Sequence, residues 1–377
     1  MAFQAQSIEG RKIRYAIVGL GWIAQEDVLP ALVHTPNSEI VTLVSNDPTK
    51  LAKLSEQYGI EKTYSYDEYE DCLNSGKIDA VYIALPNHLH CEYTVKAAEA
   101  GIHVLCEKPM AITVAECEQM IRTAKESNVK LMIAYRLHFD RSTLEAIETV
   151  QSGKLGEPRI FNSVFSQPVA EGNVRMMPID QGGGTVYDMG VYCINAARYL
   201  FGAEPIEVIA LSANNGESRF EQIDEMTSVI LKFPGERLAT FTSSFGASAV
   251  STLQIVGTKG DLKMQSAYGI QGELTHQITI DQKTYERSFQ AGDQFAAEIL
   301  YFSDCIIAGR EPEPSGEEGL ADVRIISAIY ESAKTRQPVK LEPFERSQRP
   351  NLDQAIELPA LSQTPEMIHA SDPTGSS

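Results

Sequence analysis

The chain has 377 residues, of which 43% are hydrophobic and 22% charged, and its 51 acidic and 32 basic side chains give a net charge of −19. A chain of this length exceeds the usual size of one hydrophobic core, so we expect two domains. The acidic balance argues against nucleic acid and anionic membranes as partners, because a surface that binds polyanions needs the opposite sign.

The first part of the chain alternates short apolar runs with longer amphipathic stretches, which is the pattern of a parallel sheet with crossover helices. The expected strands are 13–18, 39–45, 79–85, 102–106 and 130–135, and the expected helices are 22–34, 48–57, 90–100 and 113–126. Pro30 lies inside the first of these helices and should kink or restart it. This α/β pattern predicts a first domain over residues 12–136.

A glycine-containing turn follows the first strand and has the form G-x-G-x-x-A. Gly19 permits a tight turn, Gly21 lets the backbone approach a pyrophosphate, and Ala24 keeps the helix close to the strand. So short a motif also occurs in turns that bind nothing, but a strand before it and a helix after it favour a dinucleotide. The residues expected at this dinucleotide are Gly19, Gly21, Trp22, Ile23 and Ala24.

The tip of the second strand bears on the choice of dinucleotide. An NAD enzyme usually carries an acidic residue there, which binds the ribose diol. Here Ser45 can donate to a 2′-phosphate and Lys50 can neutralise it, so we expect NADP. Asp47 would repel that phosphate, although it could instead cap the helix that starts beside it. The alternative is that Ser45 and Lys50 are ordinary surface residues.

The third strand ends at Leu85-Pro86-Asn87, and two histidines follow. His88 and His90 lack a third ligand nearby, so we expect no metal site, and we expect His90 to open the next helix. Leu85, Asn87 and His90 are candidate cofactor contacts at this strand end.

Glu107-Lys108-Pro109 follows a nearly all-apolar strand. The head of Lys108 should therefore emerge in the crevice beyond the carboxyl ends of the strands, where ligands bind in such sheets. A partly desolvated lysine can lower the pKa of a neighbouring hydroxyl or donate a proton. The alternative is a solvated loop lysine.

After Arg136 the pattern changes to runs that alternate apolar and polar residues, which is typical of an antiparallel sheet with one wet or partner-covered face. The expected strands are 159–166, 206–213, 226–233, 237–244 and 252–256, and the expected helices are 140–152, 185–201, 292–308 and 316–334. We expect a second domain over 137–340 and a C-terminal arm over 341–377, disordered from about 365.

Three glycines, 182–184, lead into a helix that carries Asp188 and Tyr192. Glycine lets the backbone pass close to a ligand, and residues four apart lie on one helix face. That face would offer a carboxylate and a phenol, which suit the binding of a polyol and the removal of its proton. The alternative is that Tyr192 is a core aromatic and Asp188 lies near a helix cap.

The six cysteines include no C-x-x-C pair, which indicates reduced thiols in a cytoplasmic protein. Residues 1–14 are polar and the first apolar run belongs to an expected core strand. We therefore expect neither a signal peptide nor a membrane span.

Taken together, these residues resemble the glucose–fructose oxidoreductase, inositol dehydrogenase and rhizopine-catabolism (Gfo/Idh/MocA) superfamily over about residues 12–340. The resemblance is closest to its glucose–fructose oxidoreductase and aldose dehydrogenase branch. The phrases that carry it are YAIVGLG, IDAVYIALPNHLH, CEKPM, LMIAYRLHFD, GGGTVYDMGVY and SGEEGLADVRIISAIYE. It implies an N-terminal Rossmann domain and a C-terminal α/β domain whose large open, mostly antiparallel sheet forms a homodimer or homotetramer.

The resemblance also implies that Lys108 and Tyr192 act at the reacting carbon, with Tyr192 where most of the superfamily has His. Ser45 and Lys50 match the 2′-phosphate contacts of the Tyr-bearing branch, which again supports NADP. The further candidate contacts near the cofactor and substrate are Glu107, Lys108, Arg136 and Arg175.

Two departures from the family pattern stand out. Val174 lies where relatives carry a tryptophan before the counterpart of Arg175, so that wall of the pocket differs. We also expect no counterpart of the long N-terminal arm that traps the cofactor in glucose–fructose oxidoreductase itself. A dehydrogenase that exchanges NADP freely is therefore an alternative to one that holds it permanently.

We hypothesise that a cyclic aldose binds with its C1 hydroxyl at Tyr192 and Lys108. Lys108 stabilises the Tyr192 phenolate, which removes the hydroxyl proton as hydride leaves C1 for the nicotinamide. This step gives a lactone, and Asp188 orients a sugar hydroxyl. One alternative keeps the fold and acts on dihydrodiols or ketones with NADP. Another is a non-catalytic NADP-binding regulatory protein, which loss of the lysine or of the proton donor would favour.

Overall fold

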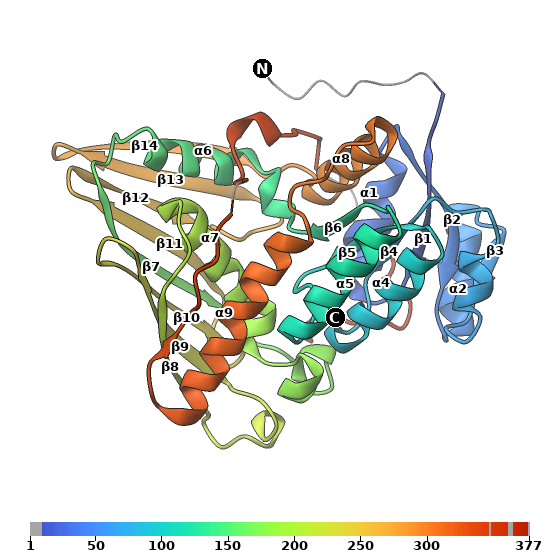
Figure 1. The fold of residues 1–377 in the computed structure, drawn as a ribbon, viewed down its shortest axis with the longest axis horizontal. Helices are drawn as coiled ribbons and strands as arrows, with labels where there is room; N and C mark the ends of the chain where they lie inside the picture. Colours follow the sequence, from blue (N-terminus) through green and yellow to red (C-terminus); the bar gives the residue numbers. More distant parts are fainter. Residues whose placement is uncertain (1–9, 347, 361–364, 376–377) are drawn as a thin grey trace. The chain divides into compact units, whose positions relative to one another are not determined.

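The computed structural model describes residues 10–346, 348–360 and 365–375, and the chain divides into two compact units (Figure 1). The first, called here the parallel-sheet unit, contains the described residues up to 136, residues 293–320 and the described residues from 357 onward. The second, the mixed-sheet unit, contains residues 137–292 and 321–356. The chain thus returns to the parallel-sheet unit twice after it leaves at Arg136.

Six parallel strands form the sheet of the parallel-sheet unit, in the order β3-β2-β1-β4-β5-β6. They are β1 (Ile13–Val18), β2 (Ser38–Val44), β3 (Lys62–Tyr64), β4 (Ala80–Ile83), β5 (His103–Glu107) and β6 (Leu131–Ala134). β4 is buried throughout, which explains its continuous apolar sequence. The strand order reverses between β1 and β4, so the carboxyl ends of these two strands flank the crevice where such sheets bind ligands.

The helices of this unit are α1 (Leu29–Val33), α2 (Pro48–Tyr58), α3 (Tyr69–Leu73), α4 (His90–Glu99), α5 (Val114–Glu126) and α8 (Gln294–Ala308). α1 and α8 pack together beside β2, whereas α4 lies on β4 and β5 with α5 next to it. The helix expected over 22–34 is divided. A π-helical turn, Ala24–Val28, precedes α1, and α1 restarts with Pro30 in its first turn because proline lacks the N–H that a continuing helix would use.

Nine strands form the sheet of the mixed-sheet unit, in the order β14-β13-β12-β11-β7-β10-β9-β8-β15. They are β7 (Pro158–Ser166), β8 (Glu207–Ala213), β9 (Met226–Phe233), β10 (Arg237–Ser244), β11 (Val250–Gly257), β12 (Gly260–Gln265), β13 (Glu273–Ile280), β14 (Lys283–Gln290) and β15 (Val339–Lys340). Among these described strands, only the β7–β10 pair is parallel. The predicted fold class, a parallel sheet joined to a larger and mostly antiparallel one, is confirmed.

The helices α6 (Arg141–Gln151) and α7 (Val191–Phe201) contact this sheet and each other. α9 (Gly316–Thr335) starts in the parallel-sheet unit and continues from Ala321 in the mixed-sheet unit. A π-helical turn, Val186–Gly190, leads directly into α7. One face of the sheet is therefore covered by helices, and the alternating burial along β9 reflects that one-sided cover.

Several strands lie outside the sequence prediction, namely β3, β12, β13, β14 and β15. Most of β14 is exposed, and it reads KTYERSFQ, so it lacks the apolar alternation that marks a half-buried strand. Such edge strands form because a neighbouring strand supplies hydrogen bonds, which the sequence of the strand itself does not encode.

The expected C-terminal arm, 341–377, is described over 341–346, 348–360 and 365–375, and residues 376–377 of its expected disordered end lie outside the described residues. In the part from 365, Ile368 and Pro373 are buried. Within the described ranges, no helix combines the length and the hydropathy needed to cross a lipid bilayer. The same residues contain no group of three or more His, Cys, Asp or Glu side chains placed to hold a metal ion.

Candidate active site

The glycine turn after β1 leaves no room for a side chain at its first position. Gly19 has a φ of +93°, and a Cβ there would lie 2.5 Å from the carbonyl oxygen of Ala84. A Cβ on Gly21, in contrast, would meet nothing within 4 Å, so the space beside that residue is open. Ala24 is fully buried, whereas Trp22 and Ile23 are half-buried. The turn therefore fits a phosphate group that approaches the backbone at the start of a helix.

The tip of β2 places Ser45 and Lys50 beside a helix start. The Asp47 side chain accepts hydrogen bonds from the backbone N–H groups of Thr49 (2.9 Å) and Lys50 (3.1 Å). It therefore caps α2, which is the alternative role that the sequence analysis gave it. Ser45 is 5% exposed, and its hydroxyl oxygen accepts from the backbone N–H of Asp47 (3.2 Å). Burial lowers the pKa of Lys50, against the attraction of Asp47.

Tyr66, in the loop after β3, joins this tip and was missed by the sequence analysis. Its phenol hydrogen-bonds to Ser45, which lowers a pKa that burial otherwise raises. The signal was absent because β3 itself was not predicted. A phenol and a hydroxyl therefore lie together where the 2′-phosphate was expected.

His90 links the two loops that follow β4 and β5. Its ring is fully buried, with Nδ1 2.9 Å from the carbonyl oxygen of Pro109 and Nε2 2.9 Å from that of Leu85. Burial lowers the pKa of His90, whereas hydrogen bonding to these carbonyl oxygens opposes that shift. Asn87 begins the short 3-10 turn between Leu85 and His90. His90 thus fixes the spacing of the loops that carry Leu85 and Lys108.

Behind Lys108, a buried phenol joins two carboxyl groups. The Tyr82 hydroxyl oxygen lies 2.8 Å from Glu107 Oε1 and 3.1 Å from Glu298 Oε1, and both Tyr82 and Glu298 are fully buried. One hydroxyl donates one strong hydrogen bond, so the second contact is satisfied best when that carboxyl is protonated and donates to the phenol.

Electrostatics decide which acid holds this proton. Burial, followed by the charge of Glu107, raises the pKa of Glu298 well above its usual range. Burial also raises the pKa of Glu107, but the positive charge of Lys108 opposes that rise. The backbone N–H of Lys108 also donates to Glu107 Oε2 at 3.2 Å. Burial therefore favours a proton on this pair, and the charge of Lys108 favours Glu298 over Glu107 as the acid that holds it.

Arg136 is the positive charge within this cluster of acids. It is 4% exposed and donates to the side-chain oxygen of Gln294. Its charge lowers the pKa values of Asp27, Glu107 and Glu298, although burial dominates and raises the pKa of Asp27 to about 7. The sequence analysis named Arg136 and Glu107 but missed Asp27, Tyr82 and Glu298, which carry no motif of their own.

The three glycines of the mixed-sheet unit form a tightly packed turn. A Cβ on Gly183 would lie 1.7 Å from the carbonyl oxygen of Met177. Gly184 has a φ of +100°, and a Cβ there would come within 3 Å of Asp224 and Tyr330 side-chain atoms. Glycine is therefore required at both positions by the protein's own packing.

Asp188 and Tyr192 follow this turn in different kinds of helix. Asp188 lies in the π-helical turn, where bonds run from i to i+5, and Tyr192 lies in α7. Arg175 Nε donates to Asp188 Oδ2 at 2.8 Å, so this carboxylate is paired. The Tyr192 ring packs edge-on against Phe165, with ring centroids 5.5 Å apart, and its side chain is only half-buried. A basic residue, a carboxylate and a phenol thus come from one short stretch of the mixed-sheet unit.

Comparisons with known proteins match both units. The N-terminal model of the GFO/IDH/MocA oxidoreductases, an oxidoreductase family with an NAD-binding Rossmann fold, matches residues 13–135, and the GFO/IDH/MocA C-terminal domain matches residues 143–263. D-xylose 1-dehydrogenase [NADP(+)] of Haloarcula marismortui is 32% identical over 90% of this chain and 96% of its own length.

Solved structures show the same likeness. The aldose-aldose oxidoreductase from Caulobacter crescentus, in complex with glycerol, is 37% identical with a TM-score of 0.83, and the match covers 88% of this chain and all of that one. KijD10, a 3-ketoreductase from Actinomadura kijaniata in complex with NADP and TDP-benzene, is 26% identical with a TM-score of 0.79, and the match covers 85% of this chain and 98% of that one.

Proposed function

The chain belongs to the GFO/IDH/MocA oxidoreductase family, and from that premise we propose that it is an NADP-dependent enzyme that oxidises a cyclic aldose at C1 to the lactone. The observation that carries the substrate class is the likeness to a D-xylose 1-dehydrogenase and to an aldose-aldose oxidoreductase, each over almost the whole chain. In this proposal, residues 12–136 bind the cofactor and residues 137–340 bind the sugar.

The tip of β2 supports NADP over NAD. Asp47, the nearest carboxylate to follow that tip, is engaged as the cap of α2, whereas Ser45 and Lys50 remain suited to a 2′-phosphate. The residues that would hold the dinucleotide are Gly19, Gly21, Trp22, Ile23, Ala24, Ser45, Lys50, Leu85, Asn87 and Glu107, with Arg136 and Arg175 near it. Bound NADP supplies the hydride acceptor.

Tyr192 is the proposed base that takes the proton of the C1 hydroxyl. Lys108 acts at the same hydroxyl and stabilises the Tyr192 phenolate, which accepts this proton as hydride leaves C1, and Asp188 orients a neighbouring sugar hydroxyl. Two contacts support these roles: the backbone N–H of Lys108 donates to the carboxyl of Glu107, and the carboxylate of Asp188 is paired with Arg175. A base of this kind contributes about 10²–10⁴ in rate.

The substrate class is tested by supplying the purified protein with NADP or NAD and a panel of aldoses, aromatic trans-diols and ketones. We expect aldoses with NADP to give the largest rise in reduced-nicotinamide absorbance. Turnover confined to diols or ketones would replace the aldose by the alternative reductase function. Binding of NADP without turnover of any substrate would indicate a regulatory protein.

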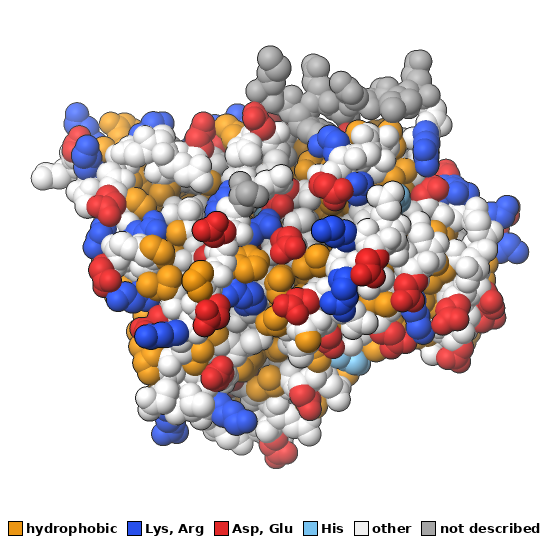
Figure 2. Space-filling model, viewed as in Figure 1, with side chains coloured by type: hydrophobic (Ala, Val, Ile, Leu, Met, Phe, Trp, Pro, Cys, Tyr) orange, Lys and Arg blue, Asp and Glu red, His pale blue; other side chains and the backbone are white. Residues whose placement is uncertain are grey.

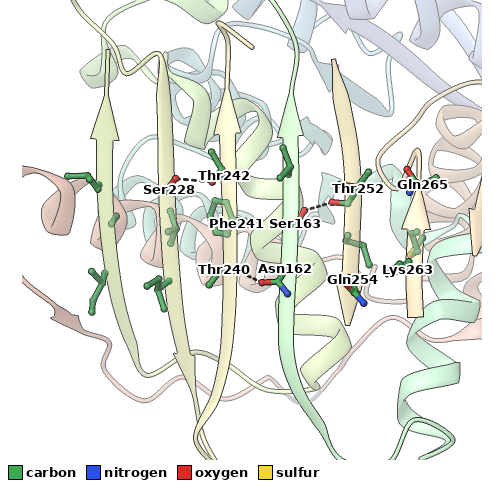
Figure 3. A pocket seen from close by; sticks show the side chains of 18 residues that line it. Asn162, Ser163, Ser228, Thr240, Phe241, Thr242, Thr252, Gln254, Lys263 and Gln265 are labelled. Carbon is green, nitrogen blue, oxygen red and sulfur yellow. Dashed lines mark hydrogen bonds between the residues drawn. The ribbon is translucent and has the colours of Figure 1, made fainter. Parts of the chain in front are cut away.

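We further propose that the protein is a homodimer or homotetramer through the face of the mixed sheet that turns away from α6 and α7. That face carries exposed apolar side chains on four neighbouring strands, among them Val164, Leu211, Ile230 and Leu238. It is hollowed into a groove of about 610 Å³ across β7 to β12, which Figure 3 shows from close by. Exposed apolar patches of this extent usually mark protein contacts.

The face of the molecule shown in Figure 2 supports a small-molecule enzyme. Acidic and basic side chains are interspersed on the face shown in Figure 2, whereas nucleic-acid binding needs a concentrated basic patch. A cytoplasmic location is proposed as well, because Cys72, Cys91, Cys106, Cys117, Cys193 and Cys305 are all free and buried. Cell fractionation with a tagged full-length chain tests it.

A further inference from the structure

The C-terminal segment, defined as residues 365–375, packs on the glycine turn of the parallel-sheet unit. The backbone N–H of Ile368 donates to Gln25 Oε1 at 2.8 Å, and Gln25 Nε2 donates to the carbonyl oxygen of Ile368 at 3.0 Å. Ile368 is 6% exposed, and Pro373 is buried as well. Two hydrogen bonds between the Gln25 side chain and the Ile368 backbone therefore hold the segment, together with the buried side chains of Ile368 and Pro373.

Gln25 connects this anchor directly to the dinucleotide motif. It follows Ala24, the last residue of the motif, and its side chain is 1% exposed. The same Nε2 that reaches Ile368 also donates to the carbonyl oxygen of Leu20 at 2.9 Å. A buried amide that bonds to both the glycine turn and the segment couples the position of one to that of the other.

The segment also reaches the tip of β2. His369 Nδ1 lies 2.8 Å from Asp47 Oδ2, while Asp47 Oδ1 caps α2. The hydrogen bond from His369 is the main cause that lowers the pKa of Asp47. Unpaired, this carboxylate would repel a phosphate placed at Ser45 and Lys50, and the contact with His369 engages its Oδ2 instead.

We propose that the C-terminal segment is a strap across the adenosine end of the dinucleotide site, which slows the release of NADP, and that His369 is a specificity-determining residue for the 2′-phosphate. The proposal rests on NADP as the cofactor. It gives this chain a way to retain its dinucleotide that is built from its own C-terminal residues. Exchange then requires the segment to leave Gln25 and Asp47.

Trp22 makes this testable without measuring catalysis. It is the single tryptophan of the chain and lies inside the glycine turn, so energy transfer from Trp22 to NADPH reports occupancy of the site. Release is followed by displacing NADPH with excess NADP in a stopped-flow instrument. The full-length chain is compared with Ile368→Asp, which places a charge in the buried anchor, and with a chain that ends at Ala360. Glu366→Ala, an exposed residue of the same segment, is the control.

Both disrupting changes should speed NADPH release by about tenfold or more, because the buried hydrogen bonds and the apolar anchor no longer hold the strap. The control should release NADPH at the full-length rate, and circular dichroism should show that each variant is folded. Equal release rates in the full-length and truncated chains would overturn the strap. Tighter binding after truncation would overturn it too, because the segment would then compete with the cofactor.

His369→Ala tests the specificity role separately. We expect the Kd for NADPH to rise by about three- to tenfold while the Kd for NADH stays within about twofold, since only NADPH carries the 2′-phosphate. An equal change for both dinucleotides, or no change, would remove His369 from the phosphate site. Failure of the full-length chain to bind any dinucleotide would instead contradict the proposed function.

Discussion

Replacing Tyr192 should lower the catalytic rate without changing the affinity for NADPH. Tyr192→Phe removes one hydroxyl and keeps the ring that packs on Phe165. We expect kcat to fall by about 10²–10⁴-fold, because the proton acceptor is lost, while the Kd for NADPH measured by Trp22 energy transfer is unchanged. Tyr285→Phe, at an exposed position of β14, is the matched control. Near-normal turnover of Tyr192→Phe would refute its role as the base.

Asp27 makes the stability of the protein depend on pH. Burial raises its pKa from 3.8 to about 7, against the opposing charge of Arg136 and with support from Glu26, Asp293 and Glu107. Between these two values the folded chain holds a proton that the unfolded chain has lost. The free energy of unfolding therefore falls as pH rises from about 4 to about 7, by as much as ~1.4 kcal/mol per pH unit from this group.

Asp27→Asn tests this linkage, because the amide resembles the protonated acid. Urea unfolding at pH 5, 6, 7 and 8 should show that the variant gains stability relative to the wild-type chain as pH rises, and that the difference levels off above about pH 7. Asp71→Asn, at an exposed position of α3, should show no such trend. Parallel stability curves for Asp27→Asn and wild type would place the pKa of Asp27 near its ordinary value.

At the scale of elements, a buried ion pair fastens α7 to α9. Arg198 Nη1 lies 2.7 Å from Asp322 Oδ1, and both side chains are completely buried. The guanidinium also bonds to Glu204 through Nε (2.6 Å) and Nη2 (3.0 Å). Both charges are buried away from water. Removing either partner would therefore leave the other charge buried and uncompensated, which destabilises the fold.

Asp322→Ala should therefore destabilise the protein strongly. We expect a loss of about 3–5 kcal/mol in the free energy of unfolding, because a buried cation loses a partner. Glu92→Ala, which removes the partly exposed ion pair with Lys96 in α4, should cost only about 0–1 kcal/mol. Denaturant titration of both variants measures the difference. Equal small losses would mean that Glu204 alone compensates the charge of Arg198.

At the scale of the whole molecule, the proposed subunit contact is the exposed apolar face of the mixed sheet. Leu211 is 60% exposed on this face, so Leu211→Glu would place a charge within the proposed subunit contact. We expect light scattering to show a dimer or tetramer for the wild-type chain and a smaller species for the variant, because an unpaired carboxylate is costly to bury. Val33→Glu, at a 63% exposed position of α1, should not change the mass. A monomeric wild-type chain would contradict the proposed assembly.

Local patterns were enough to predict the framework of this molecule. Continuous apolar runs predicted β1, β4 and β5, and the glycine motif between β1 and the first helix indicated a dinucleotide site. Runs that alternate apolar and polar residues predicted β7 to β11 as the strands of a second sheet. The strands β12 to β14 were missed: β12 is short, and the edge strand β14 is mostly exposed, with little apolar alternation, and takes its hydrogen bonds from β13.

The sequence by itself determined the family, the parallel sheet and the residue types available for catalysis, because these depend on short stretches with strong periodicity. Only the tertiary structure placed Glu298 on Tyr82, 216 residues away, and Ile368 on Gln25, 343 residues away. Neither contact follows a motif, since a buried acid or a backbone amide pairs with whatever the completed fold brings beside it. The pair of carboxyls behind Lys108 and the contact of the C-terminal segment with Gln25 therefore belong to the folded chain.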